Sequence, residues 1–297
     1  MNINDPKLRH DFVLLFDVQD GNPNGDPDAG NLPRTDPETM QGLVTDVAIK
    51  RKIRDYVSLV RSSNPKYQIY VKHRGILTHQ QKQAYEALRI DSDPKKLSSR
   101  DVARVREWMC EHFYDVRMFG AVMSTSAYNA GQVRGAVQLT FARSYDPVEP
   151  QDISITRVAL TNADDVKGGS SDDEEARSGQ MGRKAFIPYG LFRSYGFVNP
   201  AFCEQTGVSE EDLALFWEAL VNMWTIDRSA ARGFMACRGL YVFTHEDRYG
   251  RVPAQELFEL IQVHKKPGVT APRRFGDYEV NVADSTPEGV VLTRIIG

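Results

Sequence analysis

Three basic side chains lie within about one turn of a predicted helix, where they could hold a nucleic-acid backbone. Lys50, Arg51 and Arg54 are spaced so that at least two of them can face the same ribose–phosphate strand. Contacts to phosphate position a protein but carry no sequence information, so this pattern is typical of a general grip on RNA or DNA. A basic, solvated helix face is also common on soluble proteins, and the spacing alone leaves that alternative open.

A loop rich in asparagine and glycine comes just before these cations. Asn22, Asn24 and Asn31 offer amide groups to phosphate or to a 2′-hydroxyl, and the neighbouring glycines permit a close approach of the backbone. The loop has neither a P-loop nor a dinucleotide-binding pattern. It favours a phosphate-binding patch only in combination with the basic helix, and a plain surface loop is the alternative.

Four carboxylates in the same region could support cleavage of a phosphodiester. Asp17, Asp20, Asp26 and Asp28 lie close together in sequence, and paired carboxylates can hold a divalent cation. An aspartate before proline or glycine is, however, ordinary turn chemistry, and the histidines are scattered without the spacing of metal ligands. We therefore expect no catalytic residue, no metal site and no cofactor. A metal-dependent ribonuclease that uses a loop aspartate is kept as the alternative.

Further cations lie at turns and strand ends, where a sheet commonly presents groups to a ligand. Arg117 and Arg134 belong to this set, as do the arginines at positions 228, 232 and 238, and each alone is weak support for a site. Met181 with Arg183 and Lys184 could act as a wedge and a clamp, with the thioether between bases and the cations on flanking phosphates. A simple loop end is the alternative for that segment.

The overall charge limits how nucleic acid could be bound. The 297 residues carry a formal net charge of −3, with a pI near 6.1, which argues against a protein that coats nucleic acid with its whole surface. Residues 43–62 alone hold five basic side chains against two acids, a local charge of +3. Any nucleic-acid binding must therefore use local basic patches.

Cysteine usage and hydropathy favour a cytoplasmic protein with no membrane partner. The 3 cysteines are widely spaced and show neither zinc-binding nor redox-dithiol spacing. The chain has no apolar run long enough for a membrane span, and its first residues are too polar for a signal peptide.

The elements that must position these residues follow from the hydrophobic pattern. The apolar run at 12–18 predicts a buried central strand, and the turn-rich residues 19–37 predict a long loop without regular structure. Apolar residues at helical spacing from Thr39 onward predict an amphipathic helix with a basic face. Helical stripes predict an insertion over 64–115. Alternating residues then predict strands at 133–141 and 153–160.

The C-terminal part predicts the remaining elements of an α+β protein. Ser209 followed by Asp212 predicts the start of a helix. Further patterns predict a strand at 240–244, a helix at 256–263 and closing strands at 280–282 and 290–295. The order predicts an antiparallel sheet with helices on one face, the ferredoxin-like architecture of RNA-recognition motifs, with large excursions.

Several sequence motifs together carry a resemblance to a known family. They are FVLLFDV at 12–18, GNPNGDP at 21–27, NLPR at 31–34, TDVAIKRKIR at 45–54, GRK at 182–184 and PYGL at 188–191. Together they resemble the CRISPR-associated Cascade backbone subunit of subtype I-C, of the RAMP superfamily, along nearly the whole chain.

The resemblance implies a right-hand shape. The palm, an RNA-recognition-motif fold, would comprise residues 1–63, 116–144 and 188–297. Helical fingers would be inserted at 64–115, and an extended thumb would span 145–187. Within the thumb, residues 161–179 are Gly/Ser-rich and hold six acids against two basic residues.

The resemblance also implies a function and partners. The subunit would polymerise head-to-tail with neighbouring copies along a CRISPR guide RNA and would present guide segments for pairing with a target DNA strand. Arg34, Lys50, Arg51 and Arg54 would hold the guide backbone, and the thumb would fold over the RNA at a neighbouring copy. Other Cascade subunits, namely the large subunit and the one that caps or processes the guide 5′ end, would be further partners. The family implies no catalysis by this subunit, although related type III subunits cut target RNA with a loop aspartate.

Overall fold

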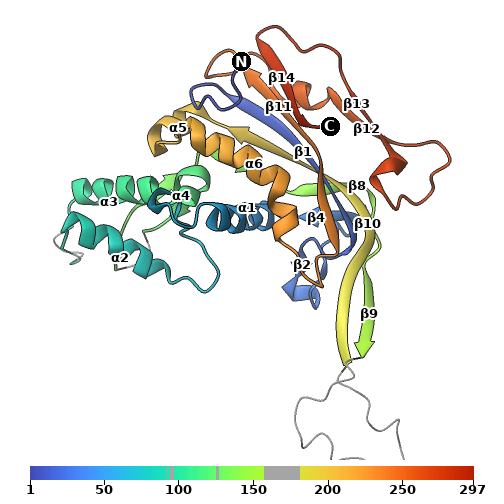
Figure 1. Cartoon of the computed structure of the whole chain (residues 1–297), viewed down its shortest axis with the longest axis horizontal. Helices are drawn as coiled ribbons and strands as arrows, with labels where there is room; N and C mark the ends of the chain where they lie inside the picture. Colours follow the sequence, from blue (N-terminus) through green and yellow to red (C-terminus); the bar gives the residue numbers. More distant parts are fainter. Residues whose placement is uncertain (92, 94–96, 125–126, 157–180) are drawn as a thin grey trace, which may run out of the picture.

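The main body of the protein is built on one antiparallel sheet (Figure 1). The computed structural model describes residues 1–91, 93, 97–124, 127–156 and 181–297. The main path of the sheet has the strand order β14-β11-β1-β10-β8-β4, and β7 and β9 also pair with β10. The strands are β1 His10–Gly21, β4 Gln41–Val44, β7 Val137–Leu139, β8 Ala142–Pro147, β9 Gln151–Thr156, β10 Met181–Val198, β11 Phe234–His245 and β14 Val290–Ile296. The mixed α and β composition and the antiparallel sheet confirm the fold class predicted from the sequence at this coarse level.

β1 is the central strand, as the apolar run at 12–18 predicts. It pairs antiparallel with β10 on one side and with β11 on the other. Phe12, Leu14 and Phe16 point into one core, whereas Val13 and Leu15 point into another on the opposite face. The uninterrupted apolar residues 12–16 are therefore stable in a strand here, because both of its faces are buried.

Two long helices cover one face of the sheet. Helix α1 (Asp46–Val60) begins at Thr45, whose side chain accepts a hydrogen bond from the Ala48 N–H. Helix α6 (Glu210–Ile226) begins with a capping box of Ser209 and Asp212, which confirms the predicted helix start. The two helices pack on each other and on the sheet in the larger hydrophobic core. The short helices α4 (Tyr114–Phe119) and α5 (Pro200–Thr206) also contact each other.

The opposite face is covered as well, which differs from the one-sided sheet expected from the sequence. Helix α7 (Ala254–Phe258) and a hairpin of β12 (Ile261–Lys265) and β13 (Tyr278–Val282) lie there. The helix predicted at 256–263 is therefore wrong beyond Phe258. Leu257, Phe258 and Ile261 all reach the same core, so the apolar spacing fits a short helix followed by a strand as well as it fits one helix.

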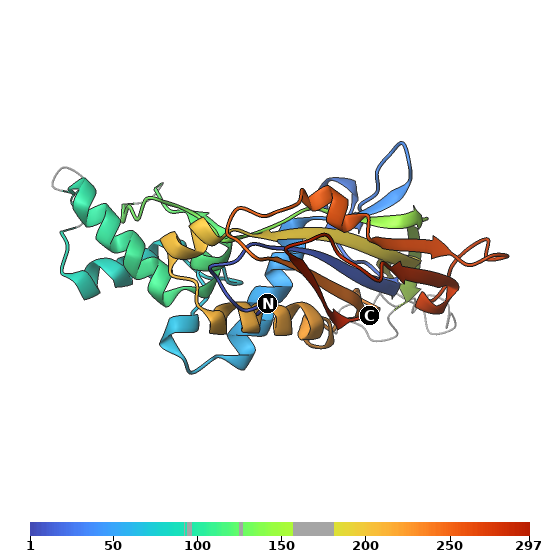
Figure 2. The ribbon, with the colours of Figure 1, turned by 90° about the horizontal axis from the view of Figure 1, so that it is seen from above.

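A helical segment with a core of its own lies between α1 and the strands that follow. It contains a 3-10 turn at Pro65–Tyr67 and the helices α2 (Leu77–Leu88) and α3 (Ser99–His112). Aromatic and aliphatic side chains from α2, α3 and α4 form a separate hydrophobic cluster, next to a small hairpin of β5 (Gly120–Val122) and β6 (Gln132–Arg134). Figure 2 shows this segment at one end of the molecule, away from the β12–β13 hairpin.

The turn-rich segment 19–37 is more regular than predicted. β1 continues to Gly21, and β2 (Gly25–Asp26) pairs with β3 (Leu32–Pro33) around a 3-10 turn at Pro27–Ala29. A tight tertiary contact makes Gly21 necessary, because a Cβ there would lie 2.0 Å from the carbonyl oxygen of Arg232.

β10 extends well beyond the sheet. Its residues from Ile187 onward pair with β1, and its first part, Met181–Phe186, pairs with β9 to form a two-stranded ribbon. The ribbon is seen below the sheet in Figure 1. Within the described part of the chain, no helix is both long and apolar enough to cross a membrane.

Candidate nucleic-acid interface

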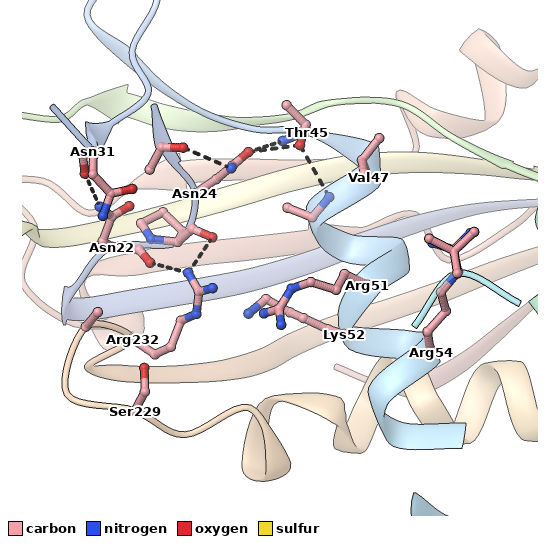
Figure 3. Close-up of a pocket in the computed structure, with 15 residues that line it drawn as sticks. Asn22, Asn24, Asn31, Thr45, Val47, Arg51, Lys52, Arg54, Ser229 and Arg232 are labelled. Carbon is pink, nitrogen blue, oxygen red and sulfur yellow. Dashed lines mark hydrogen bonds between the residues drawn. The ribbon is translucent and has the colours of Figure 1, made fainter. Parts of the chain in front are cut away.

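A basic cleft lies between the asparagine loop, helix α1 and the segment 227–233 that leads into β11 (Figure 3). Its volume is about 480 Å³. The residues that line it are Asn22, Pro23, Asn24, Gly25, Asn31, Thr45, Val47, Ala48, Arg51, Lys52, Arg54, Val71, Ser229, Ala231 and Arg232. Four of these side chains are cations and none is acidic. The asparagine loop and the basic helix therefore meet in space, as their joint use in a binding patch requires.

Asn24 attaches the loop to the start of helix α1. Its Oδ1 accepts hydrogen bonds from the backbone N–H and the hydroxyl of Thr45, both at 2.9 Å. Thr45 in turn caps α1 through the Ala48 N–H. The side-chain oxygen of Asn24 therefore already accepts two hydrogen bonds within the protein. Its amide nitrogen can still donate a hydrogen bond to a ligand.

Asn22 forms the floor of the loop. It is 3% exposed, and its Nδ2 donates to the carbonyl oxygen of Asn31 at 2.8 Å. Its backbone N–H donates to Ala231, and its carbonyl oxygen accepts from Nη1 of Arg232 at 3.0 Å. Asn22 therefore joins the two sides of the cleft, and this role requires a buried asparagine.

Asp227 gathers three cations at the base of the cleft. The buried ammonium of Lys52 pairs with it, Arg51 Nη2 lies 3.2 Å from Oδ1, and Arg232 Nε lies 3.4 Å from Oδ2. Burial lowers the pKa of Lys52 to about 8, although attraction to Asp227 opposes that shift. Burial raises the pKa of Asp227, but Lys52, Arg232 and Arg51 together outweigh burial and keep the pKa below its ordinary value.

Arg51 is the most exposed of the four cations that line the cleft. Its side chain is 48% exposed and also pairs with Asp55 at 3.0 Å. In Figure 3 it extends from α1 toward the loop, beside Lys52 and opposite Arg232. A phosphate that entered the cleft would meet Arg51 without any change in the core.

Arg54 lies deeper and joins α1 to the helical segment. Its Nε donates to Oδ2 of Asp115 at 2.8 Å, and its guanidinium lies 5.3 Å from the ring centroid of Phe119. Asp115 also accepts from the backbone N–H groups of Tyr70 and Val71. Arg54 therefore lines the cleft wall while it holds the neighbouring loop in place.

Lys50 does not line the cleft. It is 9% exposed, pairs with Asp46 one turn earlier at 2.9 Å, and lies over the ring of Phe119. The side chain that shares the cleft with Arg51 is its other neighbour, Lys52. Lys50 was predicted to face the same ligand as Arg51. Because it does not line the cleft, Lys50 is not part of the proposed interface.

Arg34 and Arg134 lie outside this cleft. Arg34 is partly exposed and pairs with Asp26 at 3.3 Å in the β2–β3 hairpin. Arg134 is exposed on β6, where its guanidinium lies 4.4 Å from the ring centroid of Phe202. The position of Arg34 in the hairpin next to the cleft leaves its predicted phosphate contact open, whereas Arg134 belongs to another surface.

Arg117 is buried and forms an ion pair with Asp212. It is 4% exposed, and its Nε and Nη2 donate to the two carboxylate oxygens of Asp212 at 3.0 and 2.6 Å. Its Nη1 donates to the carbonyl oxygens of Lys66 and Cys110. Four of the five N–H donors of its guanidinium are used within the protein, and the buried side chain is out of reach of a ligand. Arg117 therefore has a structural role, in place of the RNA contact predicted from the sequence.

The predicted wedge and clamp lies on the β9–β10 ribbon. Arg183 pairs with Asp152 on β9 at 2.5 Å, and Lys184 lies over the ring of Phe186. As neighbours in one strand, Arg183 and Lys184 project to opposite faces of the ribbon, and their predicted contacts with flanking phosphates stay a prediction. Met181 is the first residue of β10. The acidic segment 161–179 lies outside the described residues.

The loop carboxylates are used within the loop. Asp26 Oδ1 accepts from the Asp28 N–H at 3.1 Å and its Oδ2 pairs with Arg34, while Asp17 is buried against Arg238 and Tyr189. Over the part of the chain that the structure describes, no group of three or more His, Cys, Asp or Glu residues is arranged to hold a metal ion.

Sequence reasoning missed two main components of the cleft. Lys52 and Asp227 are 175 residues apart in sequence, and only the packing of α1 on α6 brings them together. Arg232 was noted only as one arginine among several. The one available signal was the run of three consecutive cations at 50–52, which on a helix must include residues that point to different sides.

Comparison with known proteins identifies relatives of most of the chain. The family model for CRISPR-associated protein Cas7 matches residues 8–283. A curated protein from Haloferax volcanii with the same description is 30% identical over 239 residues, which cover 73% of this chain and 65% of the relative. The matched region therefore spans just under two thirds of that relative's length.

Similar folds occur among solved structures. A chain of the structure titled "CRISPR RNA-guided surveillance complex, pre-nicking" matches with a TM-score of 0.51 at 16% identity, over 84% of this chain and 82% of that chain. A chain of a second structure, titled "CRISPR RNA-guided surveillance complex", has a TM-score of 0.45 at 19% identity, over 87% of this chain and 78% of that chain. The first match indicates a shared fold.

Proposed function

This chain belongs to the CRISPR-associated Cas7 family, and on that premise we propose that it is a backbone subunit of a CRISPR surveillance complex that grips guide RNA in the basic cleft. The observation that carries the proposal is the lining of that cleft, where four cations and three asparagines face one space without an acidic side chain. Phosphates of any sequence would be attracted there, because backbone contacts do not depend on the base.

The paired cations favour a preorganised site. Arg51, Lys52 and Arg232 are already held by Asp227, so few side chains need to be ordered when RNA binds. Three cations against two acids, Asp227 and the Asp55 partner of Arg51, leave the cluster a net positive charge. Arg51 would make the direct phosphate contact. Lys52 and Arg232 would add positive electrostatic potential at the same place.

We further propose that the subunit works in a complex of subtype I-C. In this proposal the sheet with α1 and α6 is the palm, the helical segment forms the fingers and the β9–β10 ribbon belongs to the thumb. Copies would assemble head-to-tail along the guide, because an interface that does not close on itself generates a helical filament. The guide would then pair with the target DNA strand. The large subunit and the subunit at the guide 5′ end would complete the complex.

The proposed role is non-catalytic. Asp26 and Asp28 form the turn between β2 and β3, and Asp26 is paired with Arg34. These contacts stabilise the turn, so both loop aspartates have a structural role. Magnesium-dependent cleavage of bound RNA that is lost in Asp26→Ala would instead establish the ribonuclease alternative.

The salt dependence of guide-RNA binding tests the proposed grip. Arg51→Gln removes one exposed charge from the cleft and leaves Lys52 and Arg232 on Asp227. We expect weaker binding and a slope of log K against log salt that is shallower by about 0.7, the value for one phosphate contact on a single strand. Fluorescence anisotropy over a salt series measures both quantities.

Arg248→Gln is the matched control. Arg248 is similarly exposed, at 44%, and is also paired with an acid, Glu204, but it does not line the cleft. The control should leave affinity and slope unchanged. If Arg51→Gln binds RNA with wild-type affinity and slope, the cleft is not the RNA site. If the purified protein binds no guide RNA and forms no oligomer on it, the backbone proposal itself fails.

A further inference from the structure

Two exposed valines line the cationic cleft. Val47 on helix α1 is 64% exposed, and Val71, in the loop after the 3-10 turn, is 46% exposed. Neither belongs to a hydrophobic core cluster. A single exposed valine requires no explanation, but two that border one basic cleft form an apolar wall beside its cations.

Val47 is placed beside the cation that would meet a phosphate. Val47 and Arg51 are four residues apart on α1, so they lie on the same helix face with their Cβ atoms about 5–6 Å apart. Figure 3 shows Val47 in the first turn of the helix and Arg51 one turn further along. An apolar surface and a charge are therefore offered together, at a separation comparable to that between the base and the phosphate of one nucleotide.

Val71 is held at the cleft by the same ion pair that positions Arg54. Oδ2 of Asp115 accepts from the Val71 N–H at 3.0 Å and from Arg54 Nε at 2.8 Å. Asp115 is itself buried. The loop that carries Val71 is thus attached to the α1 wall, and Val71 is a fixed part of the cleft's surface.

We infer that Val47 and Val71 pack against the face of a nucleobase whose phosphate is held by Arg51. The inference rests on the proposed function and adds a second component to it. Every base has an apolar face, so such packing adds affinity without selecting a sequence. The cleft would then bind both the base and the phosphate of one nucleotide.

Isosteric substitution tests this packing. Val47→Thr and Val71→Thr keep the side-chain shape but replace one methyl group with a hydroxyl. Each should weaken the binding of a short single-stranded RNA on the order of fivefold, as expected for a partly buried valine. The salt slope should not change, because no charge is removed. Both residues are already exposed, and thermal melts should show unchanged folding.

An abasic RNA of the same length separates base contacts from backbone contacts. Against that RNA the two variants should bind as tightly as the wild type, since the base that they contact is missing. Val122→Thr is the matched control, because Val122 is 63% exposed on β5 and lies outside the cleft. It should bind both RNAs with wild-type affinity.

The outcomes distinguish this inference from the proposed function. If Arg51→Gln weakens binding while both valine variants bind normally, the grip stands and the base contact is overturned. An equal loss on intact and abasic RNA would also overturn it, because the valines would then contact sugar and phosphate. If neither kind of variant affects binding, both proposals fail.

Discussion

Replacing Arg117 with methionine should destabilise the fold without weakening the proposed binding of RNA. Arg117 and Asp212 are almost fully buried and share two hydrogen bonds, at 3.0 and 2.6 Å. Methionine keeps the length of the side chain but leaves the Asp212 carboxylate as an uncompensated buried charge. Breaking a buried pair in this way costs about 3–5 kcal/mol.

That cost sets the expected change in melting temperature. Unfolding entropy near 2.1 cal/mol/K per residue gives about 0.6 kcal/mol/K for a chain of 297 residues. A loss of about 3–5 kcal/mol then lowers Tm by roughly 5–8 °C. Calorimetry and urea titration measure the loss. RNA binding, assayed well below the lowered Tm, should match the wild type.

A double variant separates the loss of the ion pair from a loss of RNA binding. Arg117→Met combined with Asp212→Asn removes the unpaired charge, so it should recover part of the stability lost in the single variant. The structural assignment is refuted if Arg117→Met melts like the wild type and binds RNA more weakly, because Arg117 would then be a ligand contact.

Three further substitutions probe the core and the cleft wall. Asp115→Asn replaces an acceptor of three hydrogen bonds, so unfolding should become easier by about 1–3 kcal/mol, and the two backbone amides that donate to it should exchange hydrogen faster. The folded pKa of Lys52, about 8, lies below the ordinary value of 10.5, so the unfolded state binds more protons between these pH values. The stability of the wild type relative to Lys52→Met should therefore rise as pH increases from about 8 to 10.5, measured by urea titration; a flat difference would refute the shift. Gly196→Ala would place a Cβ 2.0 Å from the buried ring of Phe12, so it should destabilise by at least about 1–3 kcal/mol, while Gly276→Ala, where the nearest atom is 4.0 Å away, should melt like the wild type.

The sequence predicted elements best where one residue pattern has one physical meaning. The apolar run at 12–18 can be stable only with both faces buried, and β1 is the central strand. The Ser209 and Asp212 pair satisfies helix N–H groups locally, so the start of α6 was predictable without tertiary information. The helix at 256–263 failed because a short apolar run fits helix and strand equally, and packing decided between them.

The cleft was predicted in outline but not in its chemistry. The asparagine loop and the basic helix were both recognised, and they meet as expected. Which cation on the helix faces the cleft depends on the rotation of α1 relative to the sheet, which local sequence does not define. Asp227 and Asp212 decide the roles of Lys52 and Arg117, and each comes from a segment far away in the chain.

The continuous strand β10 has a mechanical consequence for the cleft. Its 18 residues have a contour length of roughly 60 Å, with the later part paired with β1 and the first part forming the ribbon. The anchored part begins at Ile187, which pairs with Gly21, the last residue of β1 before the asparagine loop. The ribbon therefore leaves the sheet next to that loop, and a force on the ribbon would act on the sheet there.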